Sequence, residues 1–149
     1  MTLRAYPQTW TDTPWVGALA GSDEFDAVEG FWLPRPWITS EDCPKEATPA
    51  ATGDKTLGLA MFFAPNSSRV LRRGSRPYEF VGKAPADGTA IAPQGFRIVL
   101  SGRITGFSGG EPIRCRSEGG GRPTCLVAVA FDQVAFEDPA TGNTLAEWR

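Results

Sequence analysis

The chain has 149 residues, of which 41% are hydrophobic and 11% aromatic, enough to build the core of one domain. A net charge of −2 gives no sign of a nucleic-acid partner, and the absence of histidine excludes Ser-His-Asp catalysis, Cys-His catalysis and HExxH zinc sites. The apolar runs are far shorter than the roughly 18 residues of a membrane-spanning helix. We therefore expect a single β-rich domain over residues 1–149, with no metal, no cofactor, no nucleic acid and no membrane span.

Two tryptophan pairs mark residues 1–38. Both follow the pattern Trp-x3-Pro-Trp-[Val/Ile], and they comprise Trp10 with Trp15 and Trp32 with Trp37. Proline cannot donate a hydrogen bond to a neighbouring strand, so each pair predicts an extended or edge-strand segment. Tryptophan rings stack on sugars, which makes these four residues candidate ligand-binding residues. The alternative is that they are hydrophobic anchors that seal the N-terminal segment onto the rest of the domain.

A short helix is predicted between the two pairs, over residues 22–29. Ser22 would be its N-cap, acidic residues fill the first turn, and Gly30 stands at the end. Residues 39–55 contain two prolines and show no hydrophobic periodicity, so we expect a long surface loop there. This loop carries Cys43, which is interpreted either as an intermolecular partner or as an inert thiol.

Residues 56–149 form a succession of strand signals separated by glycine- and proline-rich turns. The predicted strands are residues 57–63, 69–72, 78–81, 95–105, 112–116, 125–137 and 144–148. Gly102 is expected to mark a bulge, and residues 125–137 are apolar on both faces, as in a central strand. The predicted fold class is all-β and mainly antiparallel, either a small Greek-key barrel or a β-sandwich, with at most one short helix.

Cys115 and Cys125 flank a glycine-rich turn. A hairpin folded about Gly120 places Cys115 opposite Cys125 and Ile113 opposite Val127, and opposed Cβ atoms in a hairpin lie about 4.5–5.5 Å apart. We therefore predict a disulfide between them, the alternative being two free thiols packed inside. A disulfide favours a periplasmic or secreted location. No apolar stretch of signal-peptide length follows the N-terminus, so a cytoplasmic or virion location is the alternative.

Four arginines fall within eight residues, next to Tyr78: Arg69, Arg72, Arg73 and Arg76. The planar guanidinium group suits phosphate or carboxylate ligands, so these are further candidate binding residues. The alternative is a solvated rim that balances the N-terminal part of the chain. Residues 1–54 hold nine acidic and three basic side chains, whereas the remainder holds eight acidic and twelve basic ones.

The carboxylates give little support to catalysis. Adjacent acidic residues fall in predicted turns and caps, whereas a glycosidase needs two carboxyl groups about 5–9.5 Å apart across a cleft. Asp132 interrupts an apolar run and is expected either to face outward or to be buried with Arg97 or Arg103 as its partner. We predict no catalytic residues.

The expected function is a non-catalytic β-rich binding or structural module that contacts a protein or glycan partner through its surface. One alternative is a structural subunit of a larger assembly, such as a virion or cell-envelope complex. A carboxylate-based hydrolase is the third interpretation. The sequence does not specify the oligomeric state.

Overall fold

The structure, a computed structural model, describes residues 1–20, 25–33, 57–67, 70–83, 95–107, 109–116 and 123–149. The elements in this part of the chain are one short helix, α1 (Pro14–Ala20), and the strands β1 (Thr2–Ala5), β2 (Gln8–Thr9), β3 (Ala27–Trp32), β4 (Leu57–Phe63), β5 (Tyr78–Val81), β6 (Arg97–Ile104), β7 (Ile113–Arg116), β8 (Thr124–Asp138) and β9 (Asn143–Trp148). The predicted loop of residues 39–55, with Cys43, lies outside the described residues.

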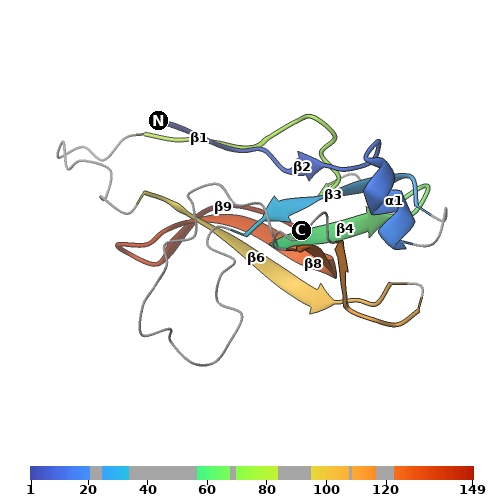
Figure 1. The fold of residues 1–149 in the computed structure, drawn as a ribbon. Helices are drawn as coiled ribbons and strands as arrows, with labels where there is room; N and C mark the ends of the chain where they lie inside the picture. Colours follow the sequence, from blue (N-terminus) through green and yellow to red (C-terminus); the bar gives the residue numbers. More distant parts are fainter. Residues whose placement is uncertain (21–24, 34–56, 68–69, 84–94, 108, 117–122) are drawn as a thin grey trace, which may run out of the picture.

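The strands form a curled mixed sheet, a half-barrel, together with a two-stranded ribbon of β1 and β5 (Figure 1). The long strand β8 is central: it pairs antiparallel with β6, β7 and β9, and parallel with β4. On the far side of β4, the sheet continues through β3 to β2. The all-β, mainly antiparallel prediction is confirmed.

The central position of β8 follows from its composition. Its residues Leu126 to Val129 are all buried, so side chains on both faces of the strand are covered. Leu126 and Ala128 pack on the face that α1 covers, in a cluster with Trp10, Val16 and Val28. Val134 and Phe136, further along β8, pack instead with residues of the β1–β5 ribbon. A strand that is apolar on both faces belongs between two layers, as predicted.

The predicted bulge is present. The register between β6 and β8 shifts between Ser101 and Gly102, which leaves Asp132 of β8 as the extra residue. Asp132 consequently faces outward, where its carboxylate pairs with Arg103 at 3.0 Å. A Cβ at Gly102 would lie 2.2 Å from the carbonyl oxygen of Ala130, so the close approach of the two strands requires glycine.

The helix predicted over residues 22–29 is wrong for the described residues 25–29, because Phe25 and Asp26 are not helical and β3 begins at Ala27. The helix of the described residues lies earlier, at Pro14–Ala20. Pro14 is the first helical residue, where proline has the right φ and needs no N–H donor. The extended conformation predicted around Pro14 and Trp15 is therefore also wrong. Pairing of β3 with β4 along its whole length outweighs the local capping signal.

The strand predicted over residues 69–72 is also wrong for the described residues Val70 to Arg72, which form a turn and irregular chain. The turn predicted after it is present, since the amide of Arg76 donates to the carbonyl of Arg73 at 3.1 Å. The remaining predicted strands are confirmed to within two residues at their ends.

Gly30 and Gly17 differ in the space available for a side chain. An alanine Cβ at Gly30 would lie 1.7 Å from the carbonyl oxygen of Leu59, whereas nothing lies within 4 Å of a Cβ at Gly17 in α1. We expect Gly30→Ala to destabilise the fold by about 1–3 kcal/mol, because β3 and β4 must move apart. Gly17→Ala should stabilise it by about 0.5–1 kcal/mol. Urea denaturation measures both, and shifts of the same sign would contradict this packing.

Candidate functional site

Of the described candidate tryptophans, Trp10 lies in the core, and Trp15 and Trp32 pack against it. Trp10 is only 3% exposed, and its ring meets that of Trp32 edge to face with centroids 5.2 Å apart. Trp15 and Trp32 are half-buried against the same cluster, and the guanidinium of Arg116 lies 5.6 Å from the centre of the Trp15 ring. Trp37 lies outside the described residues. These contacts are those of hydrophobic anchors, because the ring of Trp10 is already enclosed by protein.

The described arginines of the cluster all bond to other residues of the chain. Arg72 pairs with Asp26 at 2.8 Å, and Arg73 donates to the carbonyl of Pro77 at 2.8 Å. Arg76 donates from Nε to the carbonyl of Arg73 at 3.2 Å. Arg69 lies outside the described residues. Because each of the other three is bonded to a different partner, they do not converge on a common anion site.

Glu29 organises the same loop, and the sequence analysis missed it. This carboxylate, in β3, is only 4% exposed and accepts hydrogen bonds from the backbone amides of Arg73, at 2.8 Å, and Gly74, at 2.5 Å. A buried carboxylate is stable only where donors replace water, and the two amides do so here. The available signal was one acidic residue within the apolar stretch Ala27–Trp32.

Tyr78 holds the loop from its other end. Its hydroxyl donates to the carbonyl of Leu71 at 2.7 Å, and the guanidinium of Arg73 lies 5.2 Å from its ring centre. Burial raises the pKa of Tyr78 to about 12, with the negative charge of Glu29 adding to the effect. The folded protein favours the neutral form of Tyr78, because its pKa lies above the ordinary 10.0. The stability that this preference contributes is complete below pH 10 and is lost as the pH rises toward 12. Tyr78 therefore acts as a structural donor.

The described acidic groups are mostly in exposed ion pairs. Arg4 pairs with Glu79, Arg97 with Glu137 at 2.8 Å, and Arg114 with Glu111 at 3.0 Å. A backbone hydrogen bond and the contact with Arg114 lower the pKa of Glu111. Among the residues that the structure describes, no group of three or more Cys, Asp or Glu side chains could hold a metal ion. No described helix is long and apolar enough to cross a membrane.

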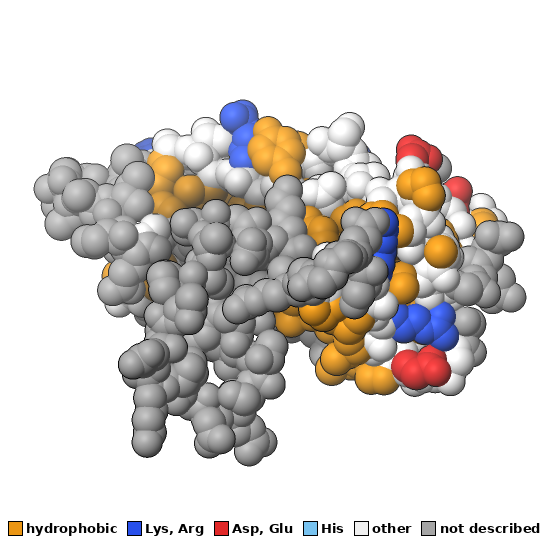
Figure 2. Space-filling model, in the orientation of Figure 1, with side chains coloured by type: hydrophobic (Ala, Val, Ile, Leu, Met, Phe, Trp, Pro, Cys, Tyr) orange, Lys and Arg blue, Asp and Glu red, His pale blue; other side chains and the backbone are white. Residues whose placement is uncertain are grey.

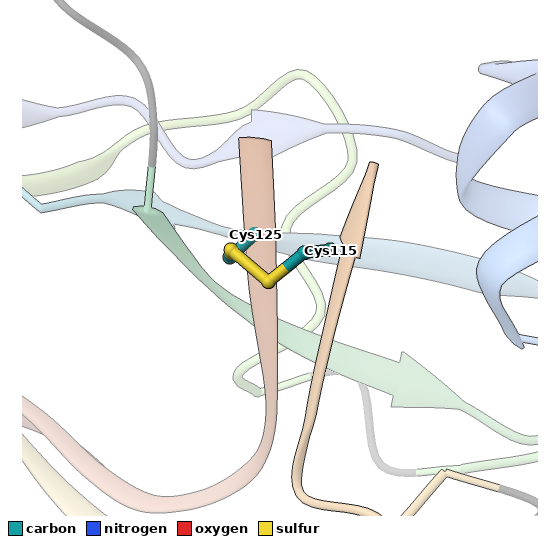
Figure 3. Close-up of a disulfide and its surroundings, with 2 residues drawn as sticks. All are labelled: Cys115 and Cys125. Carbon is teal, nitrogen blue, oxygen red and sulfur yellow. A yellow bond between two sulfur atoms is a disulfide. The ribbon is translucent and has the colours of Figure 1, made fainter. Parts of the chain in front are cut away.

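Cys115 and Cys125 form the predicted disulfide, which joins β7 to β8 (Figure 3). The register is the predicted one, with Cys115 opposite Cys125 and Ile113 opposite Val127. This bond is consistent with a location outside the reducing cytosol.

Reduction of this disulfide is expected to lower the free energy of unfolding by roughly 3 kcal/mol, because the unfolded chain regains the entropy of an open loop. Cys115→Ser/Cys125→Ser should show the same loss in urea denaturation. Alkylation and mass mapping of the denatured protein supply the check: both cysteines should be blocked before reduction and free after it. Alkylation of both before reduction would contradict the bond.

An apolar pocket of about 480 Å³ opens where β4 and β8 separate. The two strands pair in parallel only from Leu57 opposite Cys125 to Ala60 opposite Ala128, and beyond that point they diverge. The end of α1 and the segment between β6 and β7 close the sides. The lining residues are Ala20, Phe25, Met61, Phe62, Ala64, Thr105, Gly106, Phe107, Val129 and Ala130.

Exposed isoleucines line β6 and β7 near the same end of the sheet. Ile104 is 66% exposed and Ile113 50%, and both share a face with Val127 and Val129 because they stand opposite these residues in β8. Ile98, nearer the start of β6, is also exposed on this face. Figure 2 shows hydrophobic side chains gathered on the face in view near the end of β6.

No protein-family model, no curated protein and no solved structure matches this chain.

Proposed function

We propose that this chain is a non-catalytic β-rich binding module, and that it binds an extended segment of a protein partner along the outer edge of β6. The observation that carries the proposal is an eight-residue strand with exposed isoleucines and one paired edge. Within the described part of the chain, β6 pairs with β8 and with no other strand. A long exposed edge strand is a template for the addition of a further strand.

The backbone of β6 supports this use. The amide of Thr105 donates to the carbonyl of Ala128 at 2.8 Å, so Thr105 directs its hydrogen-bonding groups toward β8. Successive residues in an antiparallel strand alternate in this respect, and Ile104 therefore directs its N–H and C=O groups away from β8. An added strand would find backbone partners at Ile104 and an apolar side chain beside them.

The charges of β6 leave this edge accessible. Natural edge strands are commonly protected by unpaired charged side chains, especially lysine. In β6, Arg103 is paired with Asp132 at 3.0 Å and Arg97 with Glu137 at 2.8 Å, both across to β8. These pairs neutralise the basic groups, so we expect the partner segment to be apolar, β-branched and uncharged where it meets Ile104.

A structural subunit of a larger assembly is the second candidate, with another copy of this chain as the partner. An antiparallel pairing of two β6 strands centred on Ser101 would place Ile98 of each copy opposite Ile104 of the other. Both residues are exposed and lie on the same face, so the contact is self-complementary about a two-fold axis.

The other interpretations have less support. A glycan platform needs exposed tryptophan rings, whereas Trp10 lies in the core. A carboxylate-based hydrolase needs a free pair of carboxyl groups, whereas Asp132 and Glu137 each form an exposed ion pair. The disulfide supports the proposal that the module works in the periplasm or outside the cell.

The test uses short unstructured peptides selected from a phage-displayed library, with Ile104→Lys as the variant and Val81→Lys as the matched control. Both residues are exposed apolar strand residues, so both variants should fold. Selected peptides should shift the NMR amide signals of β6 and bind Ile104→Lys about tenfold or more weakly, because the contact with an isoleucine side chain is lost.

Two outcomes decide between the candidates. Sedimentation of the wild type as a dimer, with Ile104→Lys a monomer, would favour assembly over a peptide partner. Peptides that bind both variants equally well, from a chain that stays monomeric, would overturn the role of β6.

A further inference from the structure

We infer that the pocket between β4 and β8 is a binding site for a small neutral aromatic ligand. This inference is independent of the β6 edge. It depends on the origin of the pocket, on the rings that line it and on the absence of ionisable groups from the described part of its lining.

Two paired strands and the end of α1 supply half of the described lining residues. Met61 and Phe62 belong to β4, whereas Val129 and Ala130 belong to β8, and these strands hold their positions through pairing with β3 and β6. The opening therefore results from the topology: β8 leaves β4 after Ala128 and continues along β6. Its volume of about 480 Å³ falls within the roughly 300–1,000 Å³ that is usual for small-molecule sites.

Three phenylalanines form an aromatic wall. The Phe25 and Phe62 rings meet edge to face with centroids 5.2 Å apart, and the Phe62 and Phe107 rings do so at 5.6 Å. Each ring is thereby held at a steep angle to the next. An aromatic ligand beside Phe62 can continue this edge-to-face arrangement, which contributes about 0.5–1.5 kcal/mol per ring pair beyond the burial of apolar area.

The lining favours a neutral ligand. None of the ten lining residues in the described part of the chain is ionisable, and Thr105 has the only polar side chain among these ten. Arg114 lies 5.1 Å from the centre of the Phe107 ring, but its guanidinium already bonds to the carbonyl of Leu19 and to the carboxylate of Glu111 at 3.0 Å. A charged ligand would lose water without gaining a counter-charge.

The experiment compares two fluorescent probes that share a ring system. N-phenyl-1-naphthylamine is neutral, and 8-anilino-1-naphthalenesulfonate carries a sulfonate. We expect saturable binding of the neutral probe at one site per chain, and binding of the anionic probe that is weaker by about tenfold or more.

Three alanine-to-phenylalanine variants test whether the probe binds in this pocket. Ala130→Phe fills the pocket from β8, and Ala64→Phe fills it from the exposed end of β4, so the second remains informative if the first fails to fold. Both should reduce the affinity for the neutral probe by about tenfold or more. Ala140→Phe, in the exposed turn between β8 and β9, is the matched control and should leave binding unchanged.

The inference is overturned if the probe fails to saturate, if the anionic probe binds equally well, or if Ala64→Phe and Ala140→Phe behave alike. Ile104→Lys should bind the neutral probe as the wild type does. Failure of the pocket is therefore distinguishable from failure of the β6 edge.

Discussion

Trp10→Ala is expected to lower the free energy of unfolding by about 3–5 kcal/mol, the usual cost of removing a large aromatic side chain from a core. Trp10 is 3% exposed, and its amide donates to the carbonyl of Val28 at 2.8 Å, so both its backbone and its ring hold the N-terminal segment against β3.

The glycines beside this ring explain why the cavity would persist. A Cβ at Gly30 would lie 2.9 Å from the Trp10 ring and one at Gly58 would lie 3.1 Å from it, so the sheet is built with glycine where the indole lies. Removing the indole leaves these two positions without a side chain to move inward. The loss should therefore approach the upper end of the range.

Urea denaturation of Trp10→Ala measures the effect, and Tyr6→Ala is its control. Tyr6 is an aromatic residue from the same N-terminal segment that is 64% exposed, and we expect its loss to change stability by no more than about 0.5 kcal/mol. Equal effects of the two substitutions would show that Trp10 lies at the surface and would restore it as a candidate ligand-binding residue.

Glu29→Ala is expected to lower the free energy of unfolding by about 2–5 kcal/mol. The carboxylate accepts the backbone amides of Arg73 and Gly74, and its removal leaves two part-buried donors without an acceptor. Each such donor costs about 1–3 kcal/mol. Glu79→Ala is the matched control, because Glu79 is the acceptor of an exposed ion pair with Arg4 that should contribute about 0–1 kcal/mol.

Hydrogen exchange locates the effect within the molecule. In the wild type the amides of Arg73 and Gly74 should be protected, and in Glu29→Ala their protection should fall more than that of amides in β8. If both amides exchange at the same rate in the two proteins, the carboxylate does not anchor this loop.

Strands that are recognisable by local pattern could be predicted from the sequence. Residues 125–137, predicted as a central strand because they are apolar on both faces, make up most of β8 (Thr124–Asp138). The disulfide between Cys115 and Cys125 followed from the symmetry of a tight hairpin, and the bulge followed from Gly102. In each case the deciding feature is either a contact between residues close in sequence or the composition of a single strand.

The candidate sites depend on residues that are distant in sequence. The pocket exists because β4 pairs with β8 for only four residues before the strands diverge, and no spacing of residues encodes that divergence. In the described part of the chain, the exposed edge of β6 likewise depends on how the other strands pair with one another. The sequence analysis selected Trp10, Arg72 and Arg73 for their chemistry. Tertiary contacts, which the sequence did not predict, place Trp10 in the core and bond Arg72 to Asp26 and Arg73 to Pro77.

The sequence by itself determined a β domain, its central strand, its disulfide and the exclusion of histidine chemistry, because these depend on composition and on alternation along one segment. Only the tertiary structure decided that residues 27–29 belong to the strand β3 rather than to the end of a helix. There, six cross-strand pairs with β4 outweigh a local cap, and Glu29 is buried against amides 44 and 45 residues away. Long-range pairing decides where short-range preferences are weak, and here it also decides which strand edges and pockets are exposed.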